Sequence, residues 1–106
     1  MSNLLFICSK NQWRSPTAEA LFKNHPLHKA RSAGTGEKAR IKVNGKLLLW
    51  ADVIFVMERR HKQLLRERFP SALAEKQVII LEIADDYRFG DETLVELLKE
   101  KLRDYL

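Results

Sequence analysis

The chain has 106 residues, of which 45% are apolar and 31% charged, with one cysteine and a formal net charge of +5. These values fit a single globular domain over residues 1–106, and the one cysteine excludes an internal disulfide and fits a reducing, cytoplasmic location. The longest apolar runs fall far below the roughly 20 residues that a transmembrane helix needs, and the N-terminus lacks the basic start of a signal peptide, so no membrane association is expected.

The first half of the chain predicts two strands and two helices. Residues 3–8 form an apolar run without alternation, as expected for a strand buried on both faces. A helix is expected at about 16–24, because Pro16 suits a first helical position. A short strand over 29–33 and a short apolar helix over 46–51 are expected to follow.

The second half continues the alternation of strands and helices. A continuous apolar strand over 52–57 leads into a charged helix over 58–69, which Pro70 is expected to close. Residues 77–83 form the fourth strand, and Asp91 caps the last helix. Apolar strands that alternate with helices predict a parallel sheet with helices on both faces. One helical stripe is expected to enter the core: Leu94, Leu98, Leu102 and Tyr105.

The segment between the first strand and the first helix, residues 8–15, has the pattern of an anion-binding loop. Its peptide N–H groups can surround a tetrahedral oxyanion at the N-terminus of the helix, and Arg14 can clamp two of the oxygens. Positive potential favours Cys8 as a thiolate nucleophile, and Ser15 can donate a hydrogen bond to it. An inert buried thiol is the alternative. The expected phosphate-binding residues are Ser9, Lys10, Asn11, Gln12, Trp13, Arg14 and Ser15.

Other polar residues follow the remaining strands. Ser32 lies near the end of the second strand, and Asp85 and Asp86 follow the fourth. Because the carboxyl ends of parallel strands meet at one edge, where such sheets bind ligands, we expect these residues to lie near Cys8.

These motifs together resemble the low-molecular-weight protein tyrosine phosphatase family, and specifically a short, predicted branch of it. The likeness covers the strand and C-x5-R-S-P loop of residues 4–20, residues 32–35, Met57 with acidic Glu58, and residues 85–87. The resemblance implies a three-layer, flavodoxin-like fold with a four-stranded parallel sheet of order 2-1-3-4. It also implies these roles: Cys8 as nucleophile, Arg14 as phosphate clamp, Asp85 as general acid, Asn11 and Ser32 as loop supports, and Asp86 and Tyr87 as supporting neighbours.

Four features depart from the family pattern. Lys10 occupies a position where the family usually has Gly, and Trp13 one where many members have a second cysteine. Lys at a glycine position is expected to strain the loop, and Trp13 either stacks on a substrate ring or packs against the helix. Asp86 replaces a proline, so the general acid is either Asp85 or Asp86, with Asp85 favoured because it lies nearer the strand. The linker over 36–46 is shorter than in the family.

The leading interpretation is a phosphomonoesterase acting on a phosphotyrosine protein or small aryl phosphate, with phosphate or sulfate-type anions binding the loop and no metal or cofactor. A non-catalytic phosphoprotein binder is the second hypothesis. A thiol-coupled arsenate reductase is disfavoured, because one cysteine allows no internal relay. Nucleic-acid binding through residues 29–46, which hold six basic side chains and one acidic, is a weaker alternative.

Overall fold

The computed structural model describes residues 2–106 and contains a four-stranded, wholly parallel sheet. The strand order is β2-β1-β3-β4, as the family resemblance implied. Cys8 pairs with Gly34 at the end of β1 and β2, and Ile7 pairs with Val56 of β3. The strands are β1 (Ser2–Cys8), β2 (His28–Gly34), β3 (Val53–Val56) and β4 (Gln77–Ile80).

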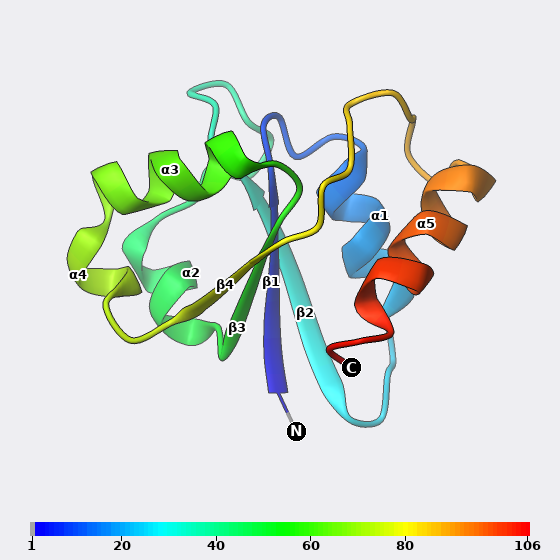
Figure 1. Ribbon diagram of the computed structural model, residues 1–106, viewed down its shortest axis with the longest axis horizontal. Coiled ribbons are helices and arrows are strands. Elements are labelled where there is room, and N and C mark those ends of the chain that lie inside the picture. The colour runs from blue at the N-terminus through cyan, green and yellow to red at the C-terminus, as the bar shows by residue number, and fades with distance from the viewer. Residues whose placement is uncertain (1) are drawn as a thin grey trace.

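Helices cover both faces of the sheet, which gives the three layers (Figure 1). One face carries α1 (Arg14–Leu21) and α5 (Glu92–Leu102). The other face carries α2 (Gly45–Trp50), α3 (Arg59–Arg68) and α4 (Pro70–Leu73). No helix within residues 2–106 is long and apolar enough to cross a membrane.

The core has two parts because successive side chains of a strand point to opposite faces. On β1, Leu4 and Phe6 pack with the α1 and α5 side, whereas Leu5 and Ile7 pack with the α2 and α3 side. Burying each such side chain contributes roughly 1.5–3 kcal/mol. Three members of the expected stripe are buried against the first part: Leu94, Leu98 and Leu102. Tyr105 lies beyond the end of α5 and is 50% exposed, but its ring packs edge-on against Phe55 of the same part, with ring centroids 6.0 Å apart.

Both ends of the first helix differ from the sequence expectation, since it ends at Leu21 rather than at about 24. The first helix begins at Arg14 rather than Pro16, and Pro16 occupies its first turn, where a missing N–H costs no intrahelical hydrogen bond. The carbonyl of Trp13 accepts from both the backbone N–H and the side-chain hydroxyl of Thr17, which fixes the earlier start. Pro70 closes α3 as expected, since α3 ends at Arg68, and it also opens the short helix α4, because proline suits a first helical position.

The strands β3 and β4 are shorter than predicted, but main-chain pairing continues past them on either side of Glu82, which is left-handed with a φ of 56°. The N–H of Leu81 donates to Val56, and the N–H of Ile83 donates to Met57, both at 2.8 Å. These bonds carry the chain to the edge of the sheet where β1 ends. The loops after β1 and β2 and the segment 81–91 meet at that edge (Figure 1).

Gly34 lies where β2 passes closest to the loop after β1, and its lack of a side chain is required there. A Cβ at this position would lie 2.5 Å from the Ser9 carbonyl oxygen and 2.7 Å from the Ala39 Cβ. Gly34→Ala is expected to lower the free energy of unfolding by about 1–3 kcal/mol through overpacking. Gly45→Ala is the control, because a Cβ there meets nothing within 4 Å. This substitution should raise the free energy of unfolding by about 0.4–1 kcal/mol. Urea unfolding measures both, and equal effects would contradict the argument.

Candidate active site

Cys8 ends β1, and its thiol is buried at the base of the loop formed by residues 8–15, here called the phosphate loop. The Sγ atom lies 3.0 Å from the Ser15 hydroxyl and 3.3 Å from the Asn11 backbone N–H. Both groups can donate to a sulfur anion, and Ser15 belongs to the first turn of α1, whose N-terminus favours negative charge. The loop therefore holds the sulfur against two hydrogen-bond donors at the N-terminus of α1.

Asn11 lies inside the loop and joins it to β2. Its buried side-chain amide donates to the hydroxyls of Ser15 and Ser32, each at 2.8 Å. The Ser32 hydroxyl in turn donates to the Glu19 carboxylate. These bonds join the phosphate loop, β2 and α1 into one buried polar network, which fixes the loop conformation.

The expected strain at Lys10 is not found. The left-handed residue of the loop is its neighbour, Asn11, with a φ of 55°, whereas Lys10 is exposed and has no positive φ. Asparagine is among the non-glycine residues that most readily adopt this region. A lysine therefore stands at the family's usual glycine position without distorting the loop.

Arg14 is buried and anchored from two sides. Its Nη1 donates to the Glu58 carboxylate at 2.6 Å and to the Ile83 carbonyl at 2.7 Å. Burial acts to raise the pKa of Glu58, but the hydrogen bonds from Arg14 and Arg60 outweigh it and lower the pKa below its ordinary value. Glu58 thus stays ionised opposite Arg14, a role that the sequence analysis did not assign to it.

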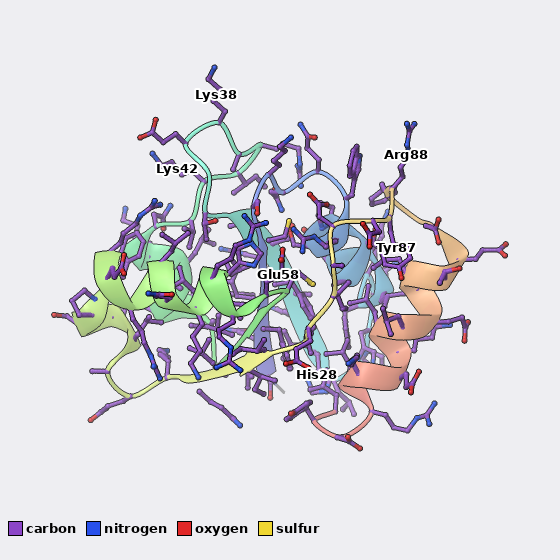
Figure 2. The ribbon with its side chains drawn as sticks, turned by 45° about the horizontal axis from the view of Figure 1, so that its top comes forward. His28, Lys38, Lys42, Glu58, Tyr87 and Arg88 are labelled. Atoms are coloured by element: carbon purple, nitrogen blue, oxygen red, sulfur yellow. The ribbon has the colours of Figure 1, made fainter. Side chains whose placement is uncertain are left out.

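The acidic residues after β4 reach the same edge of the sheet. The Asp85 carboxylate lies 3.5 Å from the Arg14 Nε, and its side chain is 43% exposed. Asp86 is exposed, and Tyr87 is half-buried against the core. In Figure 2, Glu58 lies between the start of α3 and the segment that carries Tyr87 and Arg88. Asp85 is thus the carboxylate of this segment that approaches Arg14.

His61 is a member of the site that sequence reasoning missed. Its ring is fully buried, its Nδ1 accepts from the Glu58 backbone N–H at 3.1 Å, and its Nε2 lies 2.9 Å from the Ser9 hydroxyl. Because Nδ1 accepts, Nε2 carries the proton and donates to Ser9. The sequence contains the signal, since Glu58 and His61 have the spacing of a capping box at the start of α3.

The linker after β2 braces the phosphate loop. The N–H groups of Thr35 and Gly36 donate to the carbonyls of Cys8 and Ser9, both at 2.9 Å. The Arg40 Nε donates to the Asn11 carbonyl at 3.0 Å. The outer residues of the loop are exposed: Lys10, Gln12 and Trp13. No three histidine, cysteine or acidic side chains gather as a metal site in residues 2–106.

Comparisons with known proteins identify the family. The family described as low molecular weight phosphotyrosine protein phosphatase matches residues 3–48. A protein-arginine-phosphatase of Geobacillus stearothermophilus is 30% identical, over 94% of this chain and 95% of the relative. The chain belongs to the low molecular weight phosphotyrosine protein phosphatase family.

Solved structures agree with this assignment. The tyrosine phosphatase Wzb from Escherichia coli K30 in complex with phosphate is 25% identical, with a TM-score of 0.78 over 99% of this chain and 96% of that one. The YwlE arginine phosphatase from Geobacillus stearothermophilus shares the fold, with 24% identity and a TM-score of 0.72 over 95% of this chain and 86% of that one. The chain is a cysteine-dependent phosphatase.

His61 gives this phosphatase a pH-dependent stability. Burial and the nearby cations Arg14 and Arg60 lower its pKa from 6.5 to about 4, although Glu58 and Asp85 act in the opposite direction. Between pH 6.5 and pH 4 the unfolded chain therefore binds a proton at His61 and the folded chain does not. The free energy of unfolding falls as the pH drops through this range. From about pH 7.5 to about pH 5, the titration of His61 alone is expected to lower the free energy of unfolding by about 2 kcal/mol.

Urea unfolding at these two pH values measures the effect in the wild type and in His61→Gln. Glutamine keeps the capping box but does not titrate, so the loss of stability should be about 2 kcal/mol smaller in this variant. His25→Gln, at an exposed histidine whose ring accepts from the Leu27 and His28 N–H groups, is the control and should lose about as much stability between the two pH values as the wild type does. A loss of stability in His61→Gln as large as in the wild type would contradict the assignment.

Proposed function

We propose that this phosphatase hydrolyses the phosphate monoester of a phosphotyrosine protein or a small aryl phosphate, with Cys8 as nucleophile, Arg14 as phosphate clamp and Asp85 as general acid. One observation carries the proposal: the Cys8 Sγ, held by Ser15 and the Asn11 N–H, shares a sheet edge with an Arg14–Asp85 pair only 3.5 Å apart. A nucleophile, an anion clamp and a proton donor at one edge are the groups that monoester hydrolysis needs.

The reaction has two steps. The Cys8 thiolate attacks phosphorus, the bond from phosphorus to the aryl oxygen breaks, and Asp85 gives its proton to the leaving oxygen. Water then attacks the cysteinyl-phosphate, its proton passes to the Asp85 carboxylate, the sulfur–phosphorus bond breaks, and the thiolate returns. Arg14 and the N–H groups of the phosphate loop stabilise the equatorial oxygens in both steps.

The remaining loop residues have supporting roles in this proposal. Residues 9–15 supply the N–H groups that bind phosphate-type anions, while Ser32 holds Asn11 in place. Residues 1–106 act as one domain, and the free Cys8 thiol fits a reducing cytoplasm. The relatives reported above are named as phosphatases, which favours catalysis over a non-catalytic phosphoprotein binder.

Asp85→Asn and Asp86→Asn form a matched pair that tests the assignment of the general acid. A proton donor matters most for a poor leaving group, so Asp85→Asn is expected to lower kcat/KM for phenyl phosphate by about 10²-fold or more and for 4-nitrophenyl phosphate much less. Asp86→Asn should change either rate by less than about threefold. The reverse order would assign the acid to Asp86, and no turnover by the wild type would overturn the proposal.

A phosphoarginine protein is the second candidate substrate, because the 30% identical relative is a protein-arginine-phosphatase. Peptides that differ only in carrying phosphotyrosine or phosphoarginine separate the two candidates through kcat/KM. We expect kcat/KM to be higher for the phosphotyrosine peptide than for the phosphoarginine peptide. A ratio in favour of phosphoarginine would keep the cysteine mechanism but change the leaving atom from oxygen to nitrogen.

A further inference from the structure

A groove of about 770 Å³ runs along the outer edge of β2, between that strand and the side of α1. Its apolar surface includes Phe22 and Trp50, and Phe89 reaches it from the segment that follows Asp85. Four cationic side chains also line it: Lys23, Lys29, Arg31 and Arg40. The groove begins beside the phosphate loop, because Arg40 both lines it and donates to the Asn11 carbonyl at 3.0 Å.

The edge of β2 has main-chain groups available to a further strand. Gly34 directs its N–H and carbonyl away from β1, since these bind the Ile41 carbonyl at 2.8 Å and the Val43 N–H at 3.0 Å. Main-chain groups alternate sides along a strand, so those of the half-buried Ala30 point the same way, whereas Ser32 between them is buried. In the described part of the chain, the outer side of β2 pairs only at Gly34, through its bridge to Lys42.

The charge around this edge is strongly one-sided. Residues 29–46 carry six basic side chains and one acidic side chain. Lys23, Lys29 and Arg31 are exposed, and the Arg31 guanidinium lies 4.5 Å from the centre of the Trp50 ring, which also lines the groove. Glu19, the acidic residue of the lining, is engaged by the Ser32 hydroxyl. Lys38 and Lys42 extend the positive surface over the loop after β2 (Figure 2).

We infer that an extended, acidic segment of the substrate phosphoprotein adds as a strand to the edge of β2 and lies in this basic groove. The main-chain groups of Ala30 would fix its position along β2, while Lys23 and Lys29 would select its charge. The inference rests on the proposed function, because it assigns the part of the substrate that lies outside the phosphate loop. It makes the groove a determinant of KM rather than of the chemical step.

The test compares two phosphotyrosine peptides of equal length, one with aspartates and glutamates flanking the phosphotyrosine and one with asparagines and glutamines. The wild type is expected to show a KM about tenfold lower for the acidic peptide. Lys23→Glu/Lys29→Glu should abolish this preference. The control, Arg66→Glu/Lys101→Glu, makes the same change in net charge away from the groove and should retain it. All three proteins should hydrolyse phenyl phosphate with equal kcat/KM.

A second measurement tests strand addition itself. Methylating alternate backbone nitrogens of the acidic peptide removes N–H donors without changing its charge, so KM should rise severalfold for one set of alternate positions and not for the other. Equal KM values for acidic and amide peptides, or equal effects of the two charge-reversed proteins, would overturn the inference.

Two further outcomes are distinguishable. If the wild type fails to hydrolyse phenyl phosphate, the proposed function fails, and docking is then measured by fluorescence anisotropy of a labelled acidic peptide. If a single-stranded oligodeoxynucleotide displaces that peptide at equal concentration, the groove binds nucleic acid and the inference is overturned.

Discussion

Cys8→Ser is expected to abolish turnover of phenyl phosphate, with kcat reduced by about 10⁴-fold or more. A serine hydroxyl at this position remains protonated at neutral pH, so the hydrogen bonds from Ser15 and the Asn11 N–H no longer stabilise a nucleophilic anion. The wild type should also give a phosphoenzyme when a reaction mixture is quenched with acid and analysed by mass spectrometry. The variant should give none on the time scale of one wild-type turnover.

The variant also separates loss of chemistry from loss of structure. Oxygen and sulfur are similar in size, and Cys8 is buried in a core of Leu4, Phe6 and other apolar side chains, so the fold should persist. Inorganic phosphate should still bind, because Arg14 and the loop N–H groups are unchanged, and titration calorimetry measures this directly. Turnover within tenfold of the wild type would remove Cys8 from the mechanism and leave the loop as an anion-binding site only.

The fold and the loop could be predicted because their signals are local in the sequence. The apolar run of residues 3–8, the C-x5-R-S spacing and Pro16 occupy one short stretch, and the structure places them as strand, loop and first helical turn. Asp85 was placed correctly at the sheet edge for a topological reason, since parallel strands end on the same side. Element ends were less accurate, as at β4, where main-chain pairing continues after the regular strand ends.

The supports of the site could not be predicted, because they join residues distant in the chain. The bond from Arg14 to Glu58 spans 44 positions, and that from Ser9 to His61 spans 52. Glu58 and His61 read in the sequence as the start of a charged surface helix, and only the packing of α3 against the loop turns them inward. The left-handed conformation of Asn11 was missed for a similar reason, since its bonds to Ser15 and Ser32 need the fold to be complete.

Glu58 links these two supports, because its carboxylate anchors Arg14 while its backbone N–H orients His61. A single turn at the start of α3 thereby positions both Arg14 and Ser9, at the two ends of the phosphate loop. This arrangement predicts that phosphate binding by Arg14 depends on the geometry of its side chain as well as on its charge.

Arg14→Lys is therefore expected to lower kcat/KM for phenyl phosphate by about 10²–10³-fold, although the charge is kept. One nitrogen of the guanidinium is committed to Glu58 and the Ile83 carbonyl, and the planar fork leaves the others for phosphate oxygens. A lysine ammonium cannot satisfy both sets of partners. Glu58→Gln, which keeps a hydrogen-bond acceptor, should cause a smaller loss of about tenfold.

Arg60→Lys is the matched control for this prediction. Arg60 also contacts the Glu58 carboxylate, at 3.0 Å, but from the exposed side, where ion pairs contribute little to stability. The kcat/KM of Arg60→Lys for phenyl phosphate should therefore stay within about twofold of the wild type. Circular dichroism and thermal unfolding establish that each variant is folded, and phosphate affinity from calorimetry should fall with kcat/KM only in the Arg14 and Glu58 variants. A lysine at position 14 that supports wild-type turnover would show that charge alone suffices, and the anchoring by Glu58 would then have no catalytic consequence.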